Sequence, residues 1–260
     1  MRITLIGAGR VATHLALALK TQHQIVQVLS RNLDHAQYLA HQVNAQAIDQ
    51  VTQLNPQTDV VIIAVSDQAI TEVSESIAPY LTENLVVHTS GSTNISVLGQ
   101  SHQRAGVFYP LQTFSLEREI AWQETPLFIE ATLYKDIDLL IELANSLSNR
   151  VYHYSSKQRQ TLHLAAVFAC NFSNYCYDMA KQVVDAEQVD FSLLYPLILE
   201  TANKATQNEP KQMQTGPAMR GDQNILNLHH KLLEKNSRND LVDVYQLLSE
   251  GIKKRHLHEE

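Results

Sequence analysis

Two glycines near the start of the chain have the spacing of a loop that binds a dinucleotide pyrophosphate. Gly7 and Gly9, followed by Ala12, form a G-x-G-x-x-A pattern directly after the apolar residues 3–6. The first glycine permits a tight turn, the second lets the backbone approach the phosphates, and the small third residue lets a helix pack on the strand. N–H groups at the start of that helix can then bind the phosphates. A glycine turn without a ligand is the alternative, but the flanking strand and helix favour a cofactor loop made of Gly7, Ala8, Gly9, Arg10 and Val11.

The residues after the second expected strand favour NADP(H) over NAD(H). NAD-binding loops carry Asp or Glu about 20 residues beyond the glycines, where it binds the ribose hydroxyls. This chain has Ser30, Arg31 and Asn32 at that place. No carboxylate of this segment repels a 2′-phosphate, and a guanidinium can donate two hydrogen bonds to one. The alternative is that Arg31 is an ordinary surface arginine.

Two further segments follow strands and are expected to face the nicotinamide half of the cofactor. Ligands of open parallel sheets bind outside the carboxyl ends of the strands. Val65 and Ser66 follow one strand, and Thr89, Ser90 and Gly91 follow the next. An ordinary turn is the alternative for the second segment. Asp67 is predicted to cap the helix that begins after Ser66.

The order of elements predicts an α/β fold with an N-terminal Rossmann domain, a parallel sheet with helices on both faces, followed by an all-α C-terminal domain. Short β-branched runs predict strands over residues 3–6, 25–30, 60–65, 85–88, 106–109, 127–131 and 150–153. Apolar spacings of three and four predict helices over residues 10–20, 34–42, 67–78, 135–148, 156–184, 191–206, 222–236 and 239–253, with a loop over 209–221. The change near residue 154 predicts two domains, 1–154 for NADP and 155–260 for the substrate.

Polar residues interrupt an apolar helix over residues 161–175, which is expected to be buried. At 100° per residue, His163 and Asn174 project within about 20° of each other, and Asn171 lies about 80° from His163. Buried polar groups need partners, and these could be a substrate, a neighbouring helix or a buried water. His163 is the candidate acid or base because its ordinary pKa is near neutrality. Asn171 could hold a substrate oxygen.

Two loops offer further candidates for substrate contacts. Gln112 and Thr113 follow the strand over residues 106–109. Arg220 lies in a loop with glycine and proline, and its cation suits an anionic substrate, although such arginines more often form surface ion pairs. Asp222 is predicted to cap the next helix.

Composition excludes several classes of protein. Acidic residues outnumber basic ones by 27 to 20, which argues against nucleic acid as a partner. The apolar stretch at the start is too short for a signal peptide or a membrane span, so we expect no membrane association and a cytoplasmic location. The two cysteines are expected to be reduced, and no histidine pair has metal-ligand spacing.

Six motifs in order along the chain carry a resemblance to a known family. GAGRVATHLA, AVSDQAI, HTSGS, VFYPLQTFS, HLAAVFACNFSNY and TGPAMRGD resemble the proteins that join a Rossmann-like domain to a DUF2520 domain. These are relatives of pyrroline-5-carboxylate reductase and of the 6-phosphogluconate/β-hydroxyacid dehydrogenase superfamily. The resemblance implies an NADP-binding Rossmann domain, a helical domain like the C-terminal domain of 6-phosphogluconate dehydrogenase, and a homodimer formed largely through the helices.

The same resemblance bears on the chemistry. The β-hydroxyacid dehydrogenases of that superfamily place a catalytic lysine one turn before an asparagine, and Val167 stands at that position if Asn171 is the asparagine. The pattern therefore favours an imine or ketone reductase, with His163 in place of the lysine.

The resulting hypothesis is an NADP(H)-dependent oxidoreductase that transfers a hydride to or from a small carbonyl or imine compound in a cleft between the domains. The alternative is a non-catalytic NADP-binding sensor or partner-binding protein. A methyltransferase that binds S-adenosylmethionine at the glycine loop is less favoured, because it leaves Arg31 and the helical domain without a role.

Overall fold

The computed structural model describes residues 1–236 and 238–256. The chain divides into two compact units, Met1–Cys170 and Asn171–Glu260, and each is described by itself. No described helix combines the length and the apolar composition needed to cross a membrane. Among the described residues, no group of three or more His, Cys, Asp or Glu side chains could hold a metal ion.

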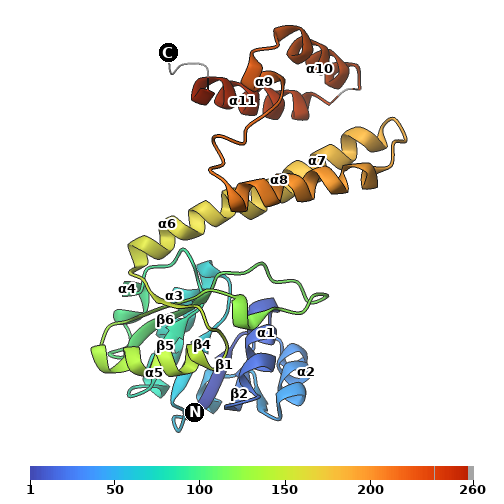
Figure 1. Ribbon diagram of the computed structural model, residues 1–260. Helices are drawn as coiled ribbons and strands as arrows, with labels where there is room; N and C mark the ends of the chain where they lie inside the picture. The colour runs from blue at the N-terminus through green and yellow to red at the C-terminus, as the bar shows by residue number, and fades with distance from the viewer. Residues whose placement is uncertain (237, 257–260) are drawn as a thin grey trace. The chain divides into compact units, whose positions relative to one another are not determined.

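The first unit is built on one eight-stranded sheet, which confirms the predicted fold class (Figure 1). Its strands run in the order β3-β2-β1-β4-β5-β6-β7-β8. They are β1 Arg2–Ile6, β2 Gln24–Leu29, β3 Gln46–Ile48, β4 Val60–Ile63, β5 Leu85–His88, β6 Ala105–Pro110, β7 Leu127–Ala131 and β8 Val151–His153. All neighbouring pairs are parallel except β6 with β7. Pattern analysis did not predict β3.

Helices cover both faces of this sheet, as predicted. They are α1 Arg10–Leu19, α2 Leu33–Val43, α3 Ile70–Ile77, α4 Ser96–Gly99 and α5 Tyr134–Asn145. Successive side chains of β4 point to opposite faces of the sheet, and both sets are hydrophobic. Val60 and Ile62 pack in the core that includes α1, α2 and α5, whereas Val61 and Ile63 pack in the core that includes α3 and α4. All four side chains are fully buried, as expected for a central parallel strand.

The long helix expected over residues 156–184 contains a wider turn. The segment consists of α6 Ser156–Ala166, a π-helix Val167–Phe172 and α7 Ser173–Asp185. A π turn has i→i+5 hydrogen bonds and therefore rotates less per residue than an α-helix. The projection of His163, Asn171 and Asn174 onto one face assumed a regular α-helix, so it does not hold across this segment.

α6 belongs to the first compact unit, although the predicted boundary lies near residue 154. The change from mixed to helical structure does occur there, after β8. Polar contacts hold α6 against the sheet beyond that point. The Arg159 guanidinium donates to the Glu130 carboxylate of β7 at 2.6 Å, and the Ser156 hydroxyl donates to it at 2.7 Å.

The second unit contains helices and a small core. After α7 come the 3₁₀ turn Phe191–Leu194, α8 Tyr195–Gln207, α9 Pro217–Arg220, α10 Gln223–Lys235 and α11 Asn239–His256. The short α9 lies inside the segment expected to be a loop. Among the described residues of this unit, the buried hydrophobic side chains are Ala218, Leu226, Leu241 and Val242.

The expected burial of the helix over residues 161–175 is wrong for the single chain. Leu164 is 59% exposed, Phe168 63% and Phe172 49%. An apolar composition on all sides therefore does not by itself predict the burial of this helix.

Candidate functional site

The glycine loop adopts the geometry that its spacing predicts. Gly7 has a φ of 113°, and its N–H donates to the carbonyl of Leu29 at 2.8 Å. A Cβ atom at Gly7 would lie 2.3 Å from the carbonyl oxygen of Ala64, so only glycine fits where β1 meets the end of β4. Gly9 precedes α1 and has open space where a Cβ would be, with no atom within 4 Å. Backbone N–H groups at the start of α1 therefore have no side-chain cap and can be approached from outside.

A cavity of about 820 Å³ opens at this loop. Most of the residues predicted to bind the cofactor line it: Gly7, Ala8, Gly9, Arg10, Val11, Ser30, Arg31, Val65 and Ser66. The cavity is also lined by residues that sequence reasoning did not select, among them Asp49, Val51, Ala69, Glu72, Val73 and Ser76. It therefore combines an open helix N-terminus, two guanidinium groups, two carboxylates and an apolar wall. These features suit the pyrophosphate, the phosphorylated ribose and the base of a dinucleotide.

The position of Asp49 bears on the inference that no carboxylate lies near Arg31. Leu29 of β2 is paired with Ile48 of β3, so Ser30 and Asp49 both follow directly after the paired ends of neighbouring strands. The sequence argument found no carboxylate after β2, which is correct for that strand. A carboxylate from β3 nevertheless borders the same cavity as Arg31. A predicted strand over residues 46–48 would have placed Asp49 at a strand end and so made it a candidate for the cofactor site.

Asn32, Thr89, Ser90 and Gly91 were also predicted to bind the cofactor, and they do not line the cavity at the glycine loop. The side chain of Asn32 accepts a hydrogen bond from the N–H of His35 at 3.2 Å and so caps α2. The other three belong to the loop after β5, which forms a separate polar cluster.

The loop after β5 is held by bonds among its own short side chains. The Ser90 hydroxyl accepts from the N–H of Ser92 at 3.1 Å and from that of Thr93 at 2.9 Å. The Ser92 hydroxyl donates to the carboxylate of Asp67. Asp67 thus bonds to the neighbouring loop, and the predicted helix cap is wrong: Ser66 occupies the capping position and no side chain caps that turn.

A buried neutral histidine lies under this loop. Nδ1 of His88 accepts the N–H of Ser90 at 3.1 Å, which leaves the proton of the neutral ring on Nε2. Burial, and after it the positive charge of Arg159, lowers the pKa of His88 to about 3, against an opposing effect of Asp67. The Nε2 atom is buried and has no hydrogen-bond partner in the described part of the chain. His88 is therefore a structural group without charge near neutral pH.

His163 contacts the same loop from α6. Its Nδ1 lies 3.1 Å from the hydroxyl of Tyr109, at the end of β6, and the two rings meet edge to face. A Cβ atom on Gly91 would lie 2.5 Å from that Nδ1 and 2.8 Å from Cζ of Tyr109. The imidazole, the phenol and the loop backbone are therefore in direct contact, and glycine is required at position 91. Sequence reasoning selected His163 and Gly91 but treated Tyr109 only as part of a strand.

The phenol defines which imidazole nitrogen can carry a proton. Burial raises the pKa of Tyr109 to about 12, with the cation of Arg159 opposing this and the carboxylate of Asp67 adding to it. The hydroxyl consequently keeps its proton and can donate to Nδ1 of His163. A neutral imidazole in that arrangement has its N–H at Nε2, away from Tyr109.

Arg159 connects the elements around this cluster. Its side chain is fully buried, and it donates to Glu130 on β7, to the carbonyl of Thr93 and to the Ser156 hydroxyl. These bonds join β7, the loop after β5 and α6. Arg159 was not selected from the sequence, because an arginine on an amphipathic helix gives no signal of burial.

Of the remaining predicted substrate residues, Gln112 and Thr113 follow β6, and Asn171, Asn174 and Arg220 belong to the second unit. Gln112 is exposed, and its Oε1 accepts from the N–H of Thr113 at 2.8 Å within one turn. Asn171 lies in the π-helix and Asn174 in α7, and both side chains are exposed. The Arg220 guanidinium donates to Asp222 at 2.9 Å, so Asp222 stands at the predicted capping position of α10 but uses its carboxylate for this ion pair.

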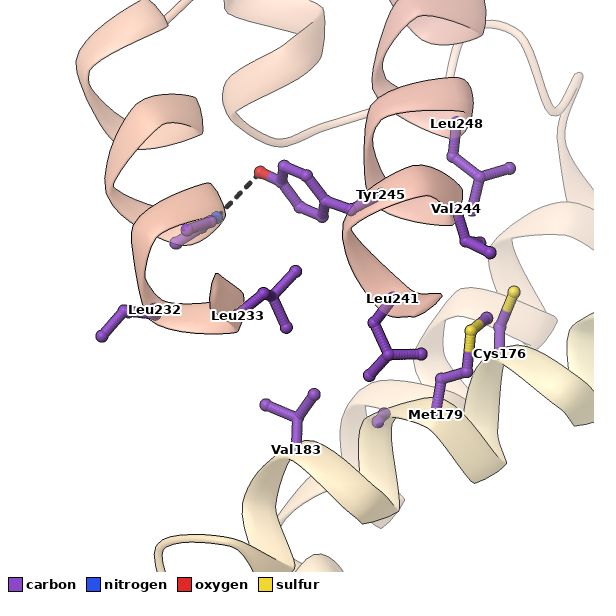
Figure 2. A pocket seen from close by; sticks show the side chains of 11 residues that line it. Cys176, Met179, Val183, Leu232, Leu233, Leu241, Val244, Tyr245 and Leu248 are labelled. Carbon is purple, nitrogen blue, oxygen red and sulfur yellow. Dashed lines mark hydrogen bonds between the residues drawn. The ribbon is translucent and has the colours of Figure 1, made fainter. Parts of the chain in front are cut away.

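A second cavity of about 410 Å³ lies within the second unit (Figure 2). Apolar side chains of α7, α10 and α11 line most of it, and Nδ1 of His229 lies 2.9 Å from the hydroxyl of Tyr245 on one side. None of the residues predicted to bind cofactor or substrate lines this cavity.

Comparison with known proteins identifies the family. A family model described as NADP oxidoreductase, coenzyme F420-dependent, matches residues 2–91, and the model of DUF2520, a domain of unknown function, matches residues 125–252. A protein of Bacteroides fragilis assigned as an NADP oxidoreductase is 41% identical, with 97% of this chain and 98% of that chain covered and a TM-score of 0.90. The chain belongs to this NADP oxidoreductase family. The predicted resemblance and the predicted cofactor class, NADP, are confirmed at the level of the family.

More distant structures share the fold of this oxidoreductase. An imine reductase of Myxococcus stipitatus in complex with NADP⁺ is 16% identical, with 99% of this chain and 100% of that chain covered and a TM-score of 0.69. A pyrroline carboxylate reductase of Plasmodium falciparum with NADP bound is also 16% identical, with 98% of each chain covered and a TM-score of 0.56. No curated protein matches the chain.

The residues of this oxidoreductase fit the cofactor of its family. Gly7 leaves room for β1 and β4 to approach, and the space beside Gly9 is open to a phosphate. Arg10 and Arg31 border the same cavity and can balance phosphate charge. The chain thus has the loop, the cations and the volume that an NADP site requires.

Proposed function

We propose that this oxidoreductase is an NADPH-dependent reductase of small carbonyl or imine compounds, with His163 as the proton donor. The single observation that carries the proposal is the contact of His163 with Tyr109 and Gly91, in which Nδ1 lies 3.1 Å from the phenol oxygen. This contact places a histidine side chain against the loop that follows β5. Parallel sheets bind their ligands at such strand ends.

The proton chemistry follows from the contact of His163 with Tyr109. When bound, NADPH supplies a hydride to the carbon of the C=O or C=N group. The protonated imidazole of His163 would give its Nε2 proton to the oxygen or nitrogen and become neutral, while its Nδ1–H donates to the Tyr109 hydroxyl oxygen and fixes the ring. Neither Tyr109 nor His88 can act as the acid near neutral pH, because the pKa of Tyr109 is about 12 and that of His88 about 3.

Cofactor binding is proposed for the residues that line the cavity at the glycine loop. The N–H groups of Gly9, Arg10 and Val11 would hold the pyrophosphate, and Arg31 the 2′-phosphate. We also place Thr89, Ser90 and Gly91 beside the nicotinamide. They follow β5, which is the neighbour of β4 in the sheet, and Gly91 contacts His163.

Substrate contacts remain proposals as well. Four exposed side chains could bind a substrate oxygen: the amides of Gln112, Asn171 and Asn174 and the hydroxyl of Thr113. An anionic substrate would need Arg220, whose charge is already paired with Asp222, and this pairing weakens that part of the proposal.

The test separates catalysis from cofactor binding. His163→Ala is expected to reduce NADPH-dependent turnover of a carbonyl or imine substrate, found by screening, by at least about 100-fold. Its NADPH dissociation constant should stay within about twofold of the wild type, since His163 does not line the cavity at the glycine loop. His153→Ala, on exposed β8, is the control and should keep full turnover.

Full turnover by the His163→Ala variant would refute the assignment of the proton donor. NADPH binding without turnover of any carbonyl or imine compound by the wild type would favour the alternative, a non-catalytic NADP sensor.

We also propose that a second copy of the chain covers the helices of the second unit. Leu193, Tyr195, Leu197 and Leu199 are between 54% and 70% exposed, whereas only four hydrophobic side chains of this unit are buried among the described residues. Large apolar side chains that are exposed in this way indicate an interface. Sedimentation of the wild type is expected to give a dimer, and Leu197→Glu with Leu199→Glu a monomer. Tyr134→Glu, which alters a more exposed apolar site on the first unit, should leave a dimer intact.

A further inference from the structure

Asp49 and Arg31 line the same cavity at the glycine loop. β2 and β3 are parallel neighbours, and the N–H of Ser30 donates to the carbonyl of Ile48 at 3.1 Å. Asp49 follows Ile48 directly, just as Ser30 follows Leu29. The Asp49 carboxylate and the Arg31 guanidinium therefore border one cavity from adjacent strand ends.

Both charges are available to a ligand. Asp49 and Arg31 are exposed, and in the described part of the chain neither side chain forms an ion pair or a hydrogen bond. The backbone N–H of Asp49 donates to Oε1 of Gln53 at 3.4 Å, which restrains the backbone at this position and leaves the carboxylate unused.

We propose that Asp49 is a second selectivity-determining residue, opposed in sign to Arg31, and that it admits NADH alongside NADPH. This inference rests on the proposed cofactor site. In NAD-binding loops a carboxylate after the second strand accepts hydrogen bonds from the ribose hydroxyls. Asp49 would do the same from the end of the neighbouring strand, β3, for a dinucleotide without the 2′-phosphate. A phosphate monoester carries a charge of about −1.5 to −2 near pH 7, so the same carboxylate repels NADPH. Arg31 attracts the phosphate, and Asp49 offsets part of that preference.

Glu72 gives an internal comparison, because it is a second carboxylate of the same cavity. It lies on α3, which follows β4, whereas Arg31 follows β2. β1 separates these two strands in the sheet. Glu72 therefore contributes negative charge to the cavity without standing next to the residues that follow β2.

The experiment measures dissociation constants of NADPH and NADH by calorimetry at fixed ionic strength, for the wild type, Asp49→Asn, Glu72→Gln and Arg31→Ala. Asp49→Asn is expected to raise the ratio of NADH to NADPH dissociation constants at least about fivefold, by tightening NADPH and weakening NADH. Glu72→Gln should leave the ratio within about twofold of the wild type, and Arg31→Ala should lower it. Salt should reduce the gain in NADPH affinity of Asp49→Asn, since it screens the repulsion.

Each failure has its own meaning. An unchanged or lower ratio for Asp49→Asn, in a variant that still binds NADPH, overturns the inference and leaves the proposed function intact. An equal shift in Glu72→Gln also overturns it, because the effect would then come from overall charge. A folded wild type that binds neither dinucleotide overturns the proposed function and the inference together.

Discussion

The buried guanidinium of Arg159 lies 2.6 Å from the carboxylate of Glu130, and this pair joins α6 to the sheet. The Arg159 side chain has no exposure, and that of Glu130 only 15%. Desolvation of two charges is offset only where the pair is well bonded, and Glu130 also accepts from the N–H and the hydroxyl of Ser156. The position of His163 therefore depends on an ion pair made four residues earlier on the same helix, α6.

Removal of one partner of this pair should be strongly destabilising. Arg159→Met is expected to lower the free energy of unfolding by about 3–5 kcal/mol, because it leaves the Glu130 charge buried without its cation. The double variant Arg159→Met with Glu130→Gln should lose less than the sum of the single variants, which urea denaturation can measure. Lys204→Met, in an exposed pair with Glu200, serves as the control and should show no measurable change. Additive losses would show that Arg159 and Glu130 stabilise the fold independently.

His88 should make stability depend on pH. Its pKa is about 3 in the folded protein and 6.5 as the ordinary value, so the unfolded chain binds one more proton between these limits. The free energy of unfolding should consequently fall as the pH decreases from 6.5 to 3, by up to about 1.4 kcal/mol per pH unit from this residue. His88→Asn keeps an acceptor for the N–H of Ser90 and should flatten this part of the pH profile. Profiles of equal slope for wild type and variant would contradict the assignment.

Gly91 should tolerate no side chain. The Cβ of Gly91→Ala would lie 2.5 Å from Nδ1 of His163, so the imidazole must move away from Tyr109. We expect a loss of about 1–3 kcal/mol of stability and a lower kcat, since overpacked sites shift their neighbours. The imidazole resonance of His163 in NMR spectra should move. Gly99→Ala is the matched control, because its nearest neighbour would be 3.8 Å away and neither stability nor kcat should change.

The two glycines of the cofactor loop should respond differently to alanine. Gly7→Ala should lower stability by at least about 2 kcal/mol, because its φ of 113° and the Ala64 carbonyl 2.3 Å away both exclude a Cβ. Gly9→Ala should keep the thermal stability of the free protein, because no atom lies within 4 Å of the new methyl group. It should nevertheless weaken NADPH at least about tenfold by blocking the approach of the pyrophosphate. Normal NADPH affinity in Gly9→Ala would place the phosphates elsewhere.

The sequence predicts the sheet well where strands are buried on both faces. The runs that form β4, β5 and β7 are continuous and β-branched or apolar, and their predicted bounds agree with the structure to within two residues. β3 has only three residues, of which Ile48 alone is buried, so it shows no alternation. Asp49 was missed for this reason, since its significance depends on the strand that precedes it.

The sequence predicted several residues of the candidate site, but it did not predict the contacts that these residues make with one another. His163 and Gly91 have distinctive chemistry and positions, whereas Tyr109 is an aromatic residue of a strand and resembles any core residue. The burial of Arg159 could not be predicted from the sequence pattern, because it depends on the carboxylate of Glu130, which lies 29 residues earlier in the sequence. The π turn was missed as well, since its apolar residues continue the helical pattern on either side of it.

The small core of the second unit has a consequence for how the protein responds to dilution. Four buried hydrophobic side chains among its described residues give little free energy to offset the ordering of its helices. If a second copy provides the missing burial, folding and association are one equilibrium, and the melting temperature rises with protein concentration. A chain kept at nanomolar concentration would then lose its helices at temperatures where a micromolar sample remains folded.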